Sequence, residues 1–281
     1  MKLLPLLSAS LLLCTTFCLG QPKKTTDKDS VEVIYKQIDT TALKLEIHYP
    51  DGWRVTDRRP AILFFFGGGW NSGSREQFRP QAMYFTRLGL ITVLADYRTK
   101  NKHQTTPFDA VSDARSAMRF LKEKGMEFGI DTSRIIASGG SAGAHLAAAT
   151  AMLNRYDDPQ DKTIISCKPA ALILFNPVID NGPDGYGYER VGGQYPYFSP
   201  MHNIRAGVPP TLFMVGTADK LIPVATAQLY QQKIQAAGGR CDLILYDEQP
   251  HGFFNFDRKT KEYYYRTIAQ TEQFLKSLGY L

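Results

Sequence analysis

Cysteine is scarce in this sequence: only four occur among 281 residues, and two of them, Cys14 and Cys18, fall within the first twenty. Small domains that depend on disulfides for their stability carry many more. The other two, Cys167 and Cys241, each lie just before an expected strand. Two thiols do not define a disulfide framework, so a single bridge and a pair of buried free thiols both remain open.

Clustered charge is absent as well. Lys and Arg number 33 against 27 Asp and Glu, and the basic residues are scattered among the acids, for a formal net charge of +6. No stripe of Lys or Arg alternates with aromatic residues, as it would on a nucleic-acid-binding surface. The charges therefore indicate solvated surface, and no nucleic-acid partner is expected.

A long apolar run suited to a stable membrane span is also lacking. Residues 1–20, "MKLLPLLSASLLLCTTFCLG", combine one lysine, a short apolar stretch interrupted by Pro5, and small residues before Gln21. This pattern predicts a signal peptide cleaved before Gln21, whereas a membrane anchor needs a longer uninterrupted run. Neither "LLLC" nor "TTFC" has the small residues of a lipoprotein site. We expect a secreted or periplasmic protein without a lipid anchor.

No internal repeat or low-complexity tract divides the rest of the chain, and one α/β domain is expected over residues 31–281 after a polar, flexible lead-in at 21–30. Two β-rich runs come first, and short apolar strands then alternate with amphipathic stretches. The expected strands are "VEVIYKQI", "LKLEIHYP", "AILFFF", "LITVLAD", "RIIASG", "ALILFNP", "TLFMVG" and "DLILYDE", and the expected helices span 75–88, 107–124, 141–153, 223–237 and 260–278. This order predicts an N-terminal antiparallel pair and a mostly parallel sheet covered by helices on both faces.

One long segment, residues 180–203, has no strand or helix pattern and is rich in Gly, Pro and Tyr. Loops of that length inside a compact domain are commonly functional. We interpret it as a substrate-side insertion or lid segment.

The first motif that indicates a catalytic site is in "RIIASGGSAGAHLAAATAML". There, Gly139 to Gly143 form a G-x-S-x-G pattern between an apolar strand and an Ala-rich helix. Glycines are needed there because a tight turn leaves no room for side chains on either side of the serine. The helix N-terminus directs N–H groups toward developing negative charge. Ser141 is therefore the predicted nucleophile, the alternative being a structural turn.

A serine hydroxyl needs a base and an acid that orients it. Only His251, in "YDEQPHGF", follows Ser141 with an acid at a strand end in between. Asp219, after "TLFMVG", has the required position, although a helix-capping role also fits it. The other candidates fit less well: His48 and His103 precede the serine, His145 lies in the helix after it, His202, Asp180 and Asp184 belong to 180–203, and Asp242 lies in or before a strand.

The glycine run in "FFFGGGW" matches neither the dinucleotide fingerprint at either register nor a Walker loop. An early strand-to-helix loop with bare backbone instead suits an oxyanion hole, which needs main-chain N–H groups close to the reacting carbonyl.

Taken together, "FGGGW", "ADYR" at 95–98, "GGSAGAHLA", "GTADKLIPV" and "PHGF" resemble the α/β-hydrolase superfamily, in particular its secreted hormone-sensitive-lipase-like and carbohydrate-esterase-like branch, over residues 31–281. The resemblance implies an α/β-hydrolase fold and the triad of Ser141, Asp219 and His251. It also implies that the backbone N–H groups of Gly68, Gly69 and Ala142 form the oxyanion hole. One departure is Phe66, where many relatives carry a histidine that supports the glycine loop.

The leading functional hypothesis is a serine carboxylesterase that forms an acyl-enzyme with short acetyl or aromatic acyl esters, including those of plant polysaccharides. Trp70, Tyr186 and Tyr188 are candidate sugar-stacking residues, and core packing explains them equally well. The alternatives are amide hydrolysis of the arylformamidase type and a non-catalytic binding protein. No cofactor is required, and "DNGPDG" lacks the later positions of a calcium loop. The expected partner is a small-molecule or oligosaccharide ester.

Overall fold

The computed structural model describes residues 30–256 and 259–281. The expected signal peptide and nearly all of the expected lead-in lie outside these residues. Ser30, assigned to that lead-in, is instead the first residue of β1.

Eight strands form one sheet in the order β1-β2-β4-β3-β5-β6-β7-β8. β1 pairs antiparallel with β2, β2 pairs antiparallel with β4, and the remaining neighbours are parallel. The strands are β1 (Ser30–Ile38), β2 (Thr41–His48), β3 (Arg59–Phe65), β4 (Ile91–Ala95), β5 (Ile130–Gly140), β6 (Ala171–Phe175), β7 (Thr211–Gly216) and β8 (Cys241–Tyr246). The predicted fold class is thereby confirmed.

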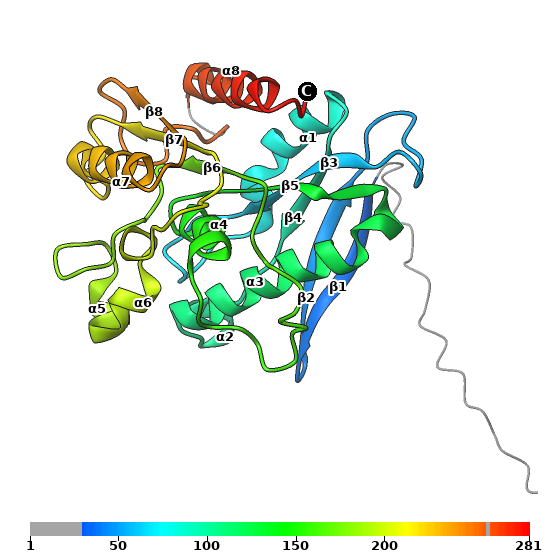
Figure 1. Cartoon of the computed structure of the whole chain (residues 1–281), viewed down its shortest axis with the longest axis horizontal. Coiled ribbons are helices and arrows are strands. Elements are labelled where there is room, and N and C mark those ends of the chain that lie inside the picture. The colour runs from blue at the N-terminus through cyan, green and yellow to red at the C-terminus, as the bar shows by residue number, and fades with distance from the viewer. Residues whose placement is uncertain (1–29, 257–258) are drawn as a thin grey trace, which may run out of the picture.

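Helices cover both faces of this sheet (Figure 1). Alternation along β3 explains why: Leu63 and Phe65 join one buried cluster, whereas Ile62 and Phe64 join the other. The first cluster takes side chains from α3 (Pro107–Lys124), α4 (Ala142–Met152) and α7 (Val224–Ala236), and the second from α1 (Arg79–Arg87) and α8 (Glu262–Ser277).

Helix α4 is buried along its whole length. It is almost entirely apolar, with alanines that permit close packing against the sheet. That burial holds the residue before it, Ser141, in a rigid frame.

The segment 180–203 is more ordered than its composition indicates. It contains α5 (Tyr188–Val191) and α6 (Tyr195–Phe198) with the turns η3 (Gly192–Gln194) and η4 (Pro200–His202). Phe198 is fully buried and stacks on His145 of α4 at 4.3 Å between ring centroids. Aromatic contacts of this kind anchor the segment to α4, although its sequence shows no helix pattern.

The helix expected at 75–88 is divided into η1 (Arg75–Phe78) and α1 (Arg79–Arg87). Two short elements were not predicted, α2 (Lys100–His103) and η2 (Gly125–Phe128). Each is too short to show a 3.6-residue pattern. Across residues 30–256 and 259–281, no helix has both the length and the apolar character that crossing a membrane requires.

Candidate active site

Ser141 lies at the junction of β5 and α4, in a backbone conformation with φ 55° and ψ −119°. A non-glycine residue is strained there, and such strain is concentrated at functional turns. The turn requires glycine on both sides. A Cβ on Gly139 would lie 2.5 Å from the Gly143 carbonyl group, and one on Gly143 would lie 2.1 Å from the Phe65 oxygen.

The structure brings the three predicted triad residues into contact. His251 Nε2 lies 2.9 Å from Ser141 Oγ, and His251 Nδ1 lies 2.7 Å from Asp219 Oδ2. The other Asp219 oxygen, Oδ1, accepts the N–H groups of Leu221 and Ile222 at 2.8 and 3.0 Å. The carboxylate is thus fixed at both oxygens and can hold the imidazole in the orientation that accepts the serine proton.

Asn176 is a site residue that sequence reasoning missed. It follows β6, is fully buried, and has a φ of 35°. Its Nδ2 lies 3.3 Å from His251 Nε2, while its Oδ1 accepts the Gly252 N–H at 3.0 Å. The available signal was its position at the carboxyl end of a parallel strand, next to the strand that carries Ser141.

The glycine loop after β3 has the bare backbone that an oxyanion hole requires. Gly68 and Gly69 have φ of +126° and +63°. The Gly67 N–H is already donated to Gln77 Oε1 at 2.6 Å. Within the residues that the structure describes, no protein hydrogen bond occupies the amides of Gly68, Gly69 or Ala142. These three amides therefore stay available for a negatively charged oxygen.

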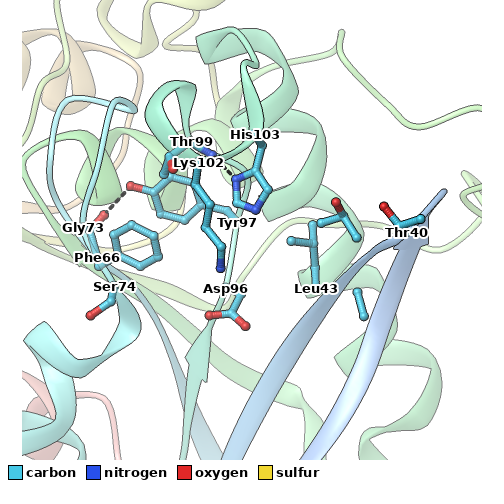
Figure 2. Close-up of a pocket in the computed structure, with 12 residues that line it drawn as sticks. Thr40, Leu43, Phe66, Gly73, Ser74, Asp96, Tyr97, Thr99, Lys102 and His103 are labelled. Atoms are coloured by element: carbon cyan, nitrogen blue, oxygen red, sulfur yellow. Dashed lines mark hydrogen bonds between the residues drawn. The ribbon is translucent and has the colours of Figure 1, made fainter.

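Phe66 supports this loop from behind, together with Tyr97. Their rings stack at 4.0 Å, and the Tyr97 hydroxyl donates to the Phe66 carbonyl oxygen at 2.8 Å (Figure 2). Helix α2 adds two main-chain bonds, from Lys100 N to Trp70 O and from Asn101 N to Asn71 O. The loop is thus held without the histidine that the family resemblance leads us to expect at position 66.

A cavity of about 230 Å³ lies against Ser141 and His251 of the triad. It is lined by Ser141, Asn176, His251, the three loop glycines, Tyr186, Leu221, Gln77, Gly252, Phe254 and Asn255. A larger cavity of about 510 Å³ shares Gly67, Gly68, Gln77 and Asn255 with it and extends to Phe256. The space near Ser141 is therefore small, and it borders a wider space beyond Gln77 and Asn255.

A third cavity, of about 380 Å³, lies behind the glycine loop and is shown in Figure 2. Phe66, Tyr97, Lys102 and His103 line it, and none of the triad residues does.

The predicted sugar-stacking residues do not form one platform. Trp70 is only 1% exposed and packs against His145, Phe198 and Tyr186. Assigning it to substrate stacking was therefore wrong, because a buried ring offers no free face. Tyr186 does line the catalytic cavity. Tyr188 is absent from that lining and contacts Tyr195 instead, so the stacking role predicted for it has no support.

The remaining histidines lie elsewhere. His145 is fully buried, which lowers its pKa to about 3, and its Nε2 lies 3.1 Å from the Phe198 carbonyl oxygen. His48 pairs with Glu46, and the Thr99 N–H donates to His103 Nδ1. Among the described residues, no group of three His, Cys, Asp or Glu side chains is placed to hold a metal ion.

The arrangement of an elbow serine, an Asp-oriented histidine and a glycine loop defines the serine hydrolases of the α/β-hydrolase fold. Comparisons with known proteins agree. A family model named BD-FAE matches residues 45–182, and one described as alpha/beta hydrolase fold matches residues 186–255.

Among solved structures, Thermogutta terrifontis esterase 2 phosphoramylated by tabun is 42% identical, with a TM-score of 0.87 over 90% of this chain and 96% of that chain. The propionate-bound form of the same esterase has a TM-score of 0.86 at 42% identity, with the same coverage. The chain belongs to the α/β-hydrolase-fold esterases, and its enzymatic class is that of the serine carboxylesterases.

Curated relatives are more distant. An acetylxylan esterase of Xylanibacter ruminicola is 26% identical, with 69% of this chain and 41% of the relative aligned. Esterase LipQ of Mycobacterium tuberculosis is also 26% identical, with 74% of this chain and 54% of the relative aligned. The chain spans about half the length of these curated relatives.

Proposed function

We propose that this protein hydrolyses short acyl esters through an acyl-enzyme on Ser141, and that the alcohol part of its substrate is a hydroxylated carbohydrate. The observation that carries this proposal is the chain of contacts from Asp219 through His251 to Ser141, at 2.7 and 2.9 Å. These distances suit proton transfer from the hydroxyl to the imidazole as the oxygen attacks.

In the proposed reaction, Ser141 Oγ attacks the ester carbonyl and His251 Nε2 takes the serine proton. The carbonyl oxygen becomes an oxyanion held by the amides of Gly68, Gly69 and Ala142. His251 returns the proton to the leaving alcohol. In the second half of the reaction, His251 takes a proton from the attacking water and gives it to Ser141 Oγ as the acyl group is released as an acid.

The cavity near Ser141, at about 230 Å³, is below the usual 300–1,000 Å³ range of ligand pockets, which favours a short acyl group. The leaving alcohol must lie near His251, because the imidazole protonates it. The wider cavity of about 510 Å³ reaches Asn255 and Phe256 on the histidine loop and offers room for a bulky alcohol there. The propionate- and butyrate-bound structures of the Thermogutta esterase support the short acyl group, and the acetylxylan esterase relative supports the carbohydrate alcohol.

The experiment compares p-nitrophenyl acetate, butyrate and octanoate, and then acetylated xylo-oligosaccharides and N-formylkynurenine. We expect rates to fall with acyl length and the acetylated oligosaccharide to be cleaved faster than the formamide. Ser141→Ala should remove all of these activities, and paraoxon, which phosphorylates the Thermogutta esterase, should label the wild type alone. A preference for N-formylkynurenine would indicate an amidase, and a wild type without acyl-enzyme or paraoxon adduct would indicate a binding protein.

We also propose that residues 1–20 direct export and are removed before Gln21. The support is the charge and apolar pattern of that stretch. N-terminal sequencing of the protein from its native source should begin at Gln21, and an intact Met1 would overturn export by cleavage.

A further inference from the structure

The glycine loop and the histidine loop must keep a fixed separation, because one binds the oxyanion while the other moves the proton. They follow β3 and β8, and β5, β6 and β7 lie between these strands. The hydrogen bonds of the sheet therefore do not join the two loops directly, and any direct contact between the loops must come from residues outside the strands.

Two carboxamide side chains span that gap. Gln77 Oε1 accepts the Gly67 N–H at 2.6 Å, and Gln77 Nε2 donates to Asn255 Oδ1 at 3.0 Å. Asn255 Nδ2 in turn donates to the Gly252 carbonyl oxygen at 2.9 Å. An unbroken line of hydrogen bonds thus runs from the glycine loop to the residue after His251.

The line continues to the imidazole. The Gly252 N–H donates to Asn176 Oδ1 at 3.0 Å, and Asn176 Nδ2 lies 3.3 Å from His251 Nε2. The orientation of Gln77 is dictated by its partners, because its oxygen must face an N–H and its nitrogen must face an oxygen.

The short turn η1, which carries Gln77, is held in place by buried aromatic packing. Phe78, the residue after Gln77, is 1% exposed and stacks on Phe64 and Phe254, at 5.3 and 5.6 Å. Phe254 belongs to the histidine loop, and a Cβ on Gly140 would lie 2.4 Å from its ring. The short turn η1 therefore contacts the glycine loop and the histidine loop, and the histidine loop packs against the serine elbow through Phe254.

We propose that Gln77 and Asn255 are positioning residues that act as one unit, the amide bridge, and hold the oxyanion amides at a fixed distance from His251. This inference rests on the proposed ester hydrolysis. The amide bridge touches no reacting atom in the proposed reaction. Its contribution is to geometry, and misplacement by about 1 Å can reduce a rate by about 100-fold.

The test uses Gln77→Met, Asn255→Leu and the double variant, with Gln231→Met as control. Gln231 donates its side-chain amide to the Cys241 carbonyl oxygen, on α7 and away from the site. We expect each single variant to lower kcat on p-nitrophenyl acetate by about 10- to 100-fold, with KM within twofold. The double variant should be no slower than the slower single variant, and the control should keep wild-type kcat.

A second readout is the rate at which paraoxon labels Ser141, which needs the triad and the oxyanion hole but no turnover. It should fall in parallel with kcat while the melting temperature of Asn255→Leu stays near that of the wild type. Multiplicative losses in the double variant, or labelling rates equal to the wild type, would overturn the proposal. A wild type that is labelled but cleaves no ester would refute the proposed function alone, and the labelling rates of the variants would still decide the role of the amide bridge.

Discussion

At the scale of single residues, the glycine loop that forms the oxyanion hole is supported by Phe66 and Tyr97 in place of a histidine. Phe66 occupies the position where the family resemblance implies a histidine, and it is 3% exposed and stacked on Tyr97. The Tyr97 hydroxyl fixes the Phe66 carbonyl oxygen directly before the glycines. The glycine loop is therefore supported by the stacked rings of Phe66 and Tyr97 and by the side-chain amide of Gln77.

Tyr97→Phe should separate the hydrogen bond from the stacking. We expect kcat to fall several-fold and the free energy of unfolding to fall by about 1 kcal/mol, because one buried hydrogen bond is lost. Tyr264→Phe is the control, since Tyr264 also donates to a main-chain oxygen, that of Pro80, but on α8. Urea unfolding and steady-state kinetics measure both effects, and an equal loss of kcat in the two variants would contradict a specific role for Tyr97.

At the scale of elements, helix α5 holds the glycine loop through a hydrogen bond from Arg190. Arg190 donates from Nη1 to the Gly69 carbonyl oxygen, and its guanidinium lies 5.1 Å from the Trp70 ring and 5.0 Å from the Tyr186 ring. The segment 180–203 thus contributes a wall of the catalytic cavity through Tyr186 and a fastening of the loop through Arg190.

Arg190→Ala should lower kcat about tenfold on small esters, because the glycine loop loses a fastening that does not touch the substrate. Arg205→Ala is the matched control: Arg205 donates to the Met152 carbonyl oxygen, at the end of α4. Kinetics on p-nitrophenyl acetate decide the matter. A wild-type rate in Arg190→Ala would show that the loop is held without α5.

The N-terminal strands are tied to η1 and α1 by an ion-pair cluster around Glu46. Its carboxylate lies 2.6 Å from Arg79 and 3.2 Å from Arg75. Burial opposes ionisation, but hydrogen bonds with His48 and Arg79 outweigh it and lower the pKa of Glu46 to about 2. The cluster therefore favours the folded state only while Glu46 is ionised.

Because the pKa of Glu46 is lower in the folded state, its contribution to stability is full above about pH 4.5 and is lost as the pH falls toward about 2. Glu46→Gln should lower the free energy of unfolding at pH 7 by about 1–3 kcal/mol. The difference from wild type should shrink below pH 4. Urea unfolding at pH 7, 4.5 and 3 measures it, with Glu262→Gln, an exposed partner of Arg266, as control. A difference that is the same at pH 7 and 3 would contradict the assignment.

At the scale of the whole molecule, stability comes from the two cores that flank the sheet. The sequence left open whether Cys167 and Cys241 form a disulfide or stay as buried free thiols. In the structure both are free and buried. Burial raises the pKa of both thiols, that of Cys241 to about 12. Neither thiol is therefore reactive in the folded protein.

Protein lacking residues 1–20 should show no reaction with Ellman's reagent when folded and two thiols when unfolded in guanidinium without reductant. Its melting temperature should not change on addition of dithiothreitol. One fast thiol in the native state, or none after unfolding, would contradict this arrangement.

The sequence by itself determined the strands, the main helices and the positions of Ser141, Asp219 and His251. It did so because apolar runs and the elbow motif are local patterns, and because parallel strands bring their carboxyl ends to one edge.

Only the tertiary structure decided that Trp70 is buried, that 180–203 is folded, and that Asn176, Gln77, Tyr97, Arg190 and Asn255 hold the site. Those residues act through contacts between distant segments: Tyr97 with Phe66 across 31 positions, Arg190 with Gly69 across 121, and Gln77 with Asn255 across 178. Local periodicity carries no information about such pairs, because segments that are far apart in the sequence meet only where the strands of the folded sheet end.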